Sequence, residues 1–77
     1  MAKKIGTVQM ARIPGPTYSV DLCTGDSLID LIERAKEAGL VVPDPMEIQI
    51  NDEKIEPDEW ATTTPDPGDE IILTKSI

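Results

Sequence analysis

Cys23 is the strongest nucleophile among the side chains of this sequence. Cysteine and serine hydrolases of the common type use a histidine as the base that activates the nucleophile. The 77 residues include no histidine, which excludes that chemistry for Cys23. A free cysteine more often packs as a small apolar side chain, and we expect this role here. We therefore predict no catalytic residue and no enzymatic activity.

Acidic side chains gather around one predicted turn, where they could hold a cation weakly. They are Asp52, Glu53, Glu56, Asp58 and Glu59. Their spacing is not that of an EF-hand loop, and with 15 acidic residues in 77, close pairs arise by chance. We expect a solvated acidic loop. The sequence also lacks a glycine-rich phosphate loop, so we predict no metal site, no cofactor-binding residue and no cofactor.

The net charge is −8, from 15 acidic and 7 basic residues. A nucleic-acid-binding protein needs a basic stripe to neutralise phosphates, and the only aromatic residues available for stacking on bases are Tyr18 and Trp60. The charge also disfavours anionic membranes. We therefore expect no nucleic-acid partner and no membrane partner. The excess of negative charge favours a basic protein partner, although solvated surface is the simpler interpretation.

The length is that of one domain, so we predict a single domain over residues 1–77. One cysteine cannot form an internal disulfide, and it fits a reducing compartment. The first residues include two lysines with no long apolar run behind them, unlike a secretory signal. No stretch approaches the roughly 18–20 apolar residues of a membrane span. We expect a cytoplasmic protein.

Two alternating segments at the start of the chain predict a β-hairpin. Residues 5–13 and 17–22 are rich in strand formers, and Pro14-Gly15-Pro16 between them is a strong turn signal. In the second segment, apolar residues alternate with polar ones over residues 17–22. The hairpin should therefore have one apolar face.

The second half of the chain predicts three further strands. Residues 46–50 alternate as a half-buried strand does. Residues 51–54 predict a turn, after which Ile55 begins a short return strand. Residues 57–60 predict a tight turn, and residues 70–75 a last strand.

A helix is predicted between these two halves. Ser27 is the expected N-cap, with Asp30 three residues later as in a capping box, and Asp26 is the rival cap. Gly39 is suited to end the helix. The apolar residues follow helical spacing on one stripe. They are Leu28, Leu31, Ile32 and Ala35.

One helix and one sheet, each with an apolar face, bury both faces by packing the helix across the sheet. The first and last strands could then lie side by side in the middle. This order predicts an α+β fold of the ubiquitin-like β-grasp type, with a mixed four- to five-stranded sheet and one helix packed across it. The predicted core is Val8, Met10, Tyr18, Val20, Leu22, Leu28, Leu31, Ile32, Ala35, Ile48, Ile50, Ile55, Trp60, Ile71 and Leu73.

Three segments resemble the sulfur-carrier proteins ThiS and MoaD of thiamine and molybdopterin synthesis. They are residues 25–28 (GDSL), 50–60 (INDEKIEPDEW) and 68–73 (GDEIIL). The resemblance covers about three quarters of the chain and lies in turns and core positions, so it implies the fold more than an activity. In that family, a C-terminal Gly-Gly follows the last strand, and its carboxylate is adenylated before it takes up sulfur.

The present sequence ends in Lys75-Ser76-Ile77, so no functional residue of that family carries over. We expect a non-catalytic protein-binding module related to ThiS and MoaD. One alternative is a sulfur carrier whose Gly-Gly tail is missing from this chain. A third interpretation is a small structural protein of a virus or phage assembly.

The last strand suggests a surface for a protein partner. Its alternation should turn Ile71 and Leu73 inward and Ile72 outward. Domains of the ubiquitin-like type often present the exposed sheet face to partners. We therefore predict that Ile72, Thr74 and Ile77 contact a partner protein.

Overall fold

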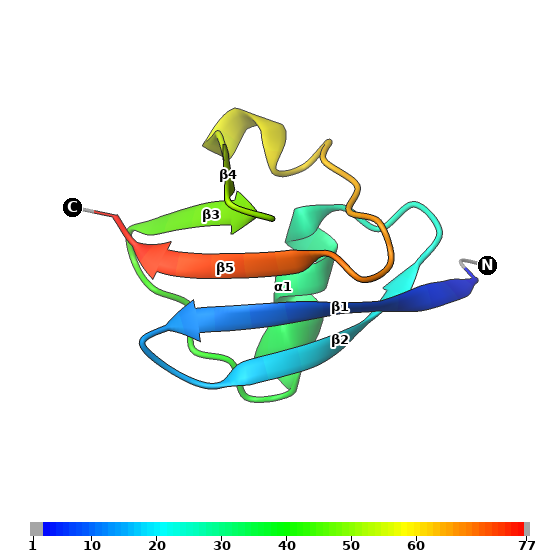
Figure 1. Cartoon of the computed structure of the whole chain (residues 1–77), viewed down its shortest axis with the longest axis horizontal. Coiled ribbons are helices and arrows are strands. Elements are labelled where there is room, and N and C mark those ends of the chain that lie inside the picture. The colour runs from blue at the N-terminus through cyan, green and yellow to red at the C-terminus, as the bar shows by residue number, and fades with distance from the viewer. Residues whose placement is uncertain (1–2, 77) are drawn as a thin grey trace.

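The computed structural model of this chain describes residues 3–76, which form one α-helix, one 3-10 helix and five strands (Figure 1). In chain order they are β1 (Lys4–Ile13), β2 (Thr17–Cys23), α1 (Leu28–Glu37), β3 (Met46–Ile50), β4 (Glu53–Ile55), the 3-10 helix η1 (Pro57–Glu59) and β5 (Glu70–Lys75). The predicted order of elements is confirmed.

The strands form one mixed sheet in the order β2-β1-β5-β3-β4. The two central strands, β1 and β5, are parallel, and the other neighbouring pairs are antiparallel. Helix α1 crosses behind the sheet in the view of Figure 1, so one face of the sheet is covered and the other is open. The chain is thus a small α+β domain, and its five-stranded mixed sheet with one helix across it is compatible with a β-grasp.

The hairpin between β3 and β4 is tighter than predicted. Asn51 and Asp52 have φ angles of 50° and 70°, and Ile50 pairs directly with Glu53. Two consecutive residues with positive φ form the type I′ turn, which suits the twist of a two-residue hairpin. The prediction that Ile55 begins the return strand is wrong, because the strand starts at Glu53 and Ile55 ends it.

Ser27 is the N-cap of α1, as predicted. Its hydroxyl accepts a hydrogen bond from the Asp30 N–H at 3.4 Å, and its own N–H donates to the Asp30 carboxylate at 3.0 Å. This reciprocal pair is a capping box. The rival candidate, Asp26, instead accepts a hydrogen bond from the Cys23 N–H at 2.8 Å. No helix within residues 3–76 is long and apolar enough to cross a membrane.

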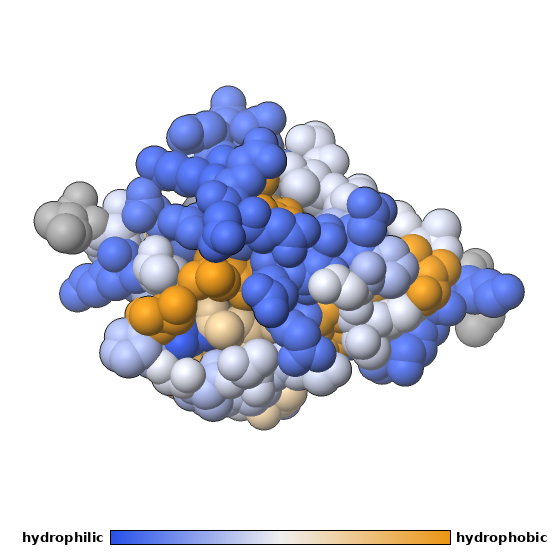
Figure 2. All heavy atoms as spheres, in the orientation of Figure 1, coloured by the Kyte–Doolittle hydropathy of each residue, from blue (hydrophilic) through white to orange (hydrophobic). Residues whose placement is uncertain are grey.

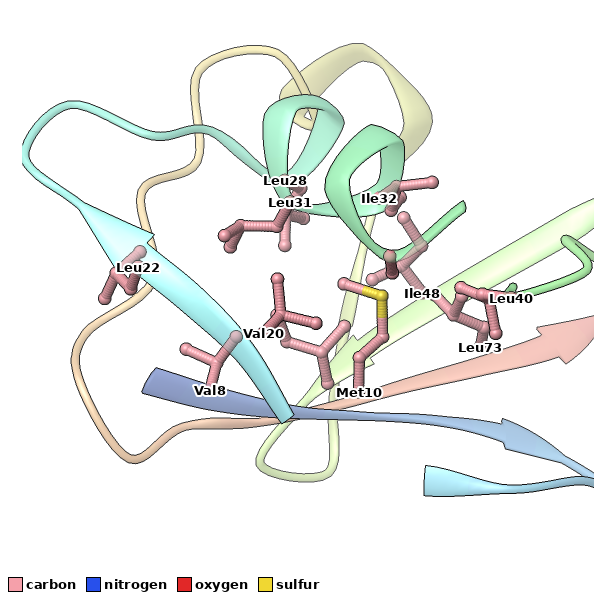
Figure 3. Close-up of a cluster of buried hydrophobic side chains, with 12 residues drawn as sticks. Val8, Met10, Val20, Leu22, Leu28, Leu31, Ile32, Leu40, Ile48 and Leu73 are labelled. Atoms are coloured by element: carbon pink, nitrogen blue, oxygen red, sulfur yellow. The ribbon is translucent and has the colours of Figure 1, made fainter. Parts of the chain in front are cut away.

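The core lies between α1 and the covered face of the sheet, where helix side chains point at side chains of β1, β2 and β5 (Figure 3). Eleven of the predicted core residues are buried, whereas Tyr18, Ile50, Ile55 and Trp60 are half-buried and pack against the edge of this cluster. With Leu40, which the prediction did not include, the buried apolar residues of this cluster are Val8, Met10, Val20, Leu22, Leu28, Leu31, Ile32, Ala35, Leu40, Ile48, Ile71 and Leu73.

The prediction missed Leu40, which is only 5% exposed. Its N–H donates to the Ala35 carbonyl at 3.0 Å, and Gly39 before it has a φ of 113°. A glycine with positive φ followed by a backbone bond to the last turn turns the chain back under the helix, where the next apolar side chain is buried. The helix end therefore places Leu40 in the core.

Candidate partner-binding face of the sheet

The alternation of β5 separates a covered set of side chains from an open set. Ile71 and Leu73 are fully buried against the helix side, so Ile72 and Thr74 lie on the opposite, open face. There Ile72 is opposite Ala11 of the parallel neighbour β1. On the open face Ile72 and Thr74 are half-buried by their neighbours on the adjoining strands.

Three apolar side chains, Ala11, Ile13 and Ile72, lie on this open face, and we call them the sheet-face patch. Figure 2 shows apolar surface over the C-terminal ends of β1 and β5, and a separate apolar area near the start of β1, within a mostly hydrophilic face. Ile13 is 53% exposed. A groove of about 130 Å³ runs here between the strands. It is lined by Gln9, Ala11, Ile13, Thr17, Glu70, Ile71 and Ile72.

The structure thus brings together two of the three predicted partner-binding residues. Thr74 is opposite Ile13 of β1 and Glu47 of β3, which places it at the border of the patch. Ile77 lies outside the described residues. The sequence prediction did not include Ala11 and Ile13. Their parity relative to the inward Val8 and Met10 could have found them, once β1 is placed beside β5.

Two exposed ion pairs link neighbouring strands of the sheet. The Lys54 ammonium lies 3.0 Å from the carboxylate of Glu47, which is opposite Thr74 at the border of the patch. Lys4, at the far end of β1 from the patch, lies 3.1 Å from Asp21. The hydrogen bond to Glu47, helped by the nearby charges, raises the pKa of Lys54 above its ordinary value. Because both pairs are largely exposed, each contributes little to stability. The Lys54–Glu47 pair and Glu70 place charged groups beside the patch, as the polar rim of a protein interface does.

The other residues considered for chemistry lie apart from this face. Cys23 is half-buried at the end of β2, as expected for a packed free cysteine. The carboxylates of the acidic loop (Asp52, Glu53, Glu56, Asp58 and Glu59) are all exposed. Among residues 3–76, no cluster of three or more potential ligand side chains is placed to hold a metal ion.

A second hollow, of about 530 Å³, lies beside Trp60. The Trp60 indole N–H donates to the Ile55 carbonyl at 3.0 Å, so this donor is already used within the domain. The hollow is lined by Lys36, Val42, Pro43, Asp44, Pro45, Met46, Pro57 and Trp60. The hollow is wide and open, so a partner protein could bind there instead of at the sheet-face patch. An experiment on the patch has to distinguish binding at these two surfaces.

The chain matches no known family model, no curated protein and no solved structure. The resemblance to the ThiS and MoaD sulfur carriers therefore stays a prediction. The function has to be argued from the geometry of the open face.

Proposed function

We propose that this chain is a ubiquitin-like β-grasp domain, related to the ThiS and MoaD carriers, that binds another protein through the open face of its sheet. The observation that carries the proposal is the sheet-face patch, where Ala11, Ile13 and Ile72 adjoin a groove on a mostly polar face. Contiguous exposed apolar side chains with a polar rim mark interaction sites more often than scattered ones do.

The patch is small, and its size limits the affinity it can supply. Burying the exposed half of Ile13 contributes on the order of 1 kcal/mol. Such a contribution is well below the cost of association, so a partner must also use the polar rim. With a net charge of −8 on this chain and Glu70 lining the groove, the partner that gains most from the rim is a basic protein.

Two of the segments that resemble the sulfur carriers contact each other. The Asn51 side-chain amide donates to the Asp69 carboxylate at 3.0 Å, and the Glu70 N–H donates to the Asn51 amide oxygen at 3.1 Å. These bonds fasten the β3–β4 turn to the start of β5. The residues shared with the sulfur carriers thus have a structural role in this chain. This role supports a relation in fold, and it does not require that the domain carries sulfur.

The proposal is tested by placing a photo-crosslinking amino acid at Ile13 and, as a matched control, at Asp58, an exposed residue of η1. We expect a discrete adduct with one protein from extracts of the source organism at position 13 alone. The adduct should disappear when Ile72→Asp is added. The captured protein, once purified, should bind the Ile72→Asp variant at least tenfold more weakly than the native chain in calorimetry.

A crosslinker at Asp44, beside the Trp60 hollow, separates the two surfaces. An adduct from position 44 with none from position 13 would place the partner at the hollow and overturn the proposal. An adduct at position 13 that persists in the Ile72→Asp variant would also count against it. The sulfur-carrier alternative has its own test, because it requires a coding sequence in which Gly-Gly follows Ile77.

A further inference from the structure

The two edges of the sheet are built differently. The β4 edge has only three residues and includes Lys54, and short charged edges resist pairing with another strand. The β2 edge has seven residues, Thr17–Cys23, with no proline and no lysine among them. In Figure 1, β2 lies along the outer border of the sheet. A long edge strand without these protective features is available for pairing with another chain.

The register shows which backbone groups of β2 point away from the sheet. In an antiparallel pair, directly opposite residues alternate between bonded and non-bonded pairs. The Arg12 N–H donates to the Pro16 carbonyl at 3.4 Å, so Arg12 and Pro16 are a bonded pair. Two residues further along each strand, Met10 and Tyr18 are the next bonded pair. The backbone groups of the residues between the bonded ones, Thr17, Ser19 and Asp21, therefore point to the free edge.

One half of this edge is already occupied by the domain itself. The Arg34 guanidinium donates to the Asp21 carbonyl at 2.6 Å, and the Asp26 carboxylate accepts the Cys23 N–H at 2.8 Å. Arg34 and Asp26 also form an ion pair at 2.6 Å. This pair closes the end of β2 from the Asp21 carbonyl onward. Among residues 3–76, no hydrogen bond uses the outward backbone groups of Thr17 and Ser19 or the Asp21 N–H.

An acidic hollow of about 480 Å³ lies along α1 and meets β2 at Asp21, where the free part of the edge ends. Arg34 marks this meeting point, because it lines the hollow and also bonds the Asp21 carbonyl of β2. Four carboxylates line the hollow against one guanidinium. The lining residues are Thr24, Gly25, Asp26, Asp30, Glu33, Arg34 and Glu37. Asp26 is paired with Arg34, and Glu33 with Lys36 at 3.3 Å. Among residues 3–76, Asp30 and Glu37 are therefore the carboxylates of the hollow that form no ion pair, and they leave it negative.

We infer that the free edge of β2 accepts an extended, basic segment of a partner protein as an additional strand, next to residues 17–21. The backbone of the segment bonds Thr17, Ser19 and the Asp21 N–H, and its Lys or Arg side chains on the helix side reach the acidic hollow. A second copy of this chain is disfavoured as the occupant, because each copy has a net charge of −8.

The inference does not depend on the sheet-face patch. The two surfaces are neighbours, since Thr17 lines the groove of the patch and is also the first residue of the free edge. Addition of a strand changes the exchange of the backbone amides of β2, whereas binding at the patch changes the surroundings of side chains on β1 and β5. An experiment can therefore disprove strand addition without disproving binding at the patch, and the reverse.

The test uses a synthetic peptide of alternating lysine and valine as the probe, with the native domain labelled for amide NMR. We expect amide-exchange protection of Ser19 and Asp21 to rise at least tenfold on binding. A peptide of alternating glutamate and valine should give no protection. A third peptide with proline in place of valine keeps the positive charge but cannot pair as a strand, and it should also leave these amides unprotected.

Variants test the two contributions separately. Ser19→Pro removes the outward N–H and should weaken binding of the lysine–valine peptide at least tenfold, whereas Ser19→Thr keeps the N–H and should bind as the native chain does. Glu33→Gln with Glu37→Gln lowers the charge of the hollow at exposed positions, and should weaken binding about fivefold with the protected amides unchanged. This double variant decides the question even where Ser19→Pro fails to fold.

Three results would overturn the inference. The first is no protection of Ser19 and Asp21 at millimolar peptide. The second is equal binding of the acidic and basic peptides, which would exclude the proposed charge preference. The third is a set of perturbed amides confined to β1 and β5, which would place the basic segment at the sheet-face patch.

Discussion

The two faces of the sheet are made from the same strands but have opposite compositions. On the covered face, side chains of β1, β2, β3 and β5 join α1 in one cluster of buried apolar residues. On the open face, the alternate residues are mostly polar, and Ala11, Ile13 and Ile72 stand out from them. The difference shows that one face is committed to stability. The apolar residues of the other face are therefore free to serve binding.

The largest expected effect on stability comes from placing a charge on the covered face. Ile71 is fully buried and lies opposite Met10 of β1 and Ile50 of β3. Ile71→Asp places an unpaired carboxylate in the core, and we expect it to cost more than about 4 kcal/mol, which a domain of this size cannot tolerate. Circular dichroism should show an unfolded chain at 25 °C. A folded Ile71→Asp variant would mean that the covered face is not the core.

The next largest effect on stability is expected from breaking the Asp26–Arg34 pair, which lies where the covered face meets the β2 edge. Asp26 is only 7% exposed, and its hydrogen bond from Arg34, then that from the Cys23 N–H, lowers the pKa of Asp26 below its ordinary value. We expect Asp26→Asn to cost about 1–2 kcal/mol at pH 7 in urea unfolding, because a charge-assisted hydrogen bond is lost.

The same pair predicts a pH dependence. Because the pKa of Asp26 is lower in the folded state, its contribution to stability is complete above the unfolded pKa of about 3.9 and is lost as the pH falls through the folded pKa. The native chain and Asp26→Asn should therefore converge in stability as the pH falls through the folded pKa of Asp26, which lies below the ordinary value. A constant difference between them from pH 7 to pH 2 would contradict this assignment.

A smaller effect is expected at the start of α1. Ser27→Ala removes the hydroxyl that accepts the Asp30 N–H, and the loss of an N-cap costs about 1 kcal/mol. Thermal unfolding should show a lower melting temperature, with binding at the open face unchanged. Ser27→Thr keeps a capping hydroxyl and serves as the control. Equal losses in both variants would show that the hydroxyl is not the source of the effect.

The smallest effect on stability is expected at the centre of the sheet-face patch. Ile72→Asp puts the charge on the open face, where water reaches it, and should change the free energy of unfolding by less than about 0.5 kcal/mol. Binding to the partner should nevertheless weaken at least tenfold. If Ile72→Asp instead unfolds the chain, the difference between the two faces does not hold at this position.

The sequence alone was enough for the elements and most of the core, because both follow from local patterns. The alternation of residues 46–50 and 70–75 and the helical spacing after Ser27 predicted β3, β5 and α1. It was not enough for Leu40, since its burial depends on how the chain turns after Gly39. The start of β4 was missed for a related reason. Positive φ at Asn51 and Asp52 shortened the turn.

The candidate site divides in the same way. Ile72 was predicted from its parity within one strand, a local property that the sequence contains. Ala11 and Ile13 join it only because β1 lies parallel to β5, and the free edge of β2 exists only because β1 takes the place beside β5. The sequence thus determined which way each side chain faces within its strand. The order of elements predicted that β1 and β5 are neighbours, and the sheet order confirms it. Tertiary structure decided their register, because pairing between residues some sixty positions apart follows from burying the helix and the sheet together.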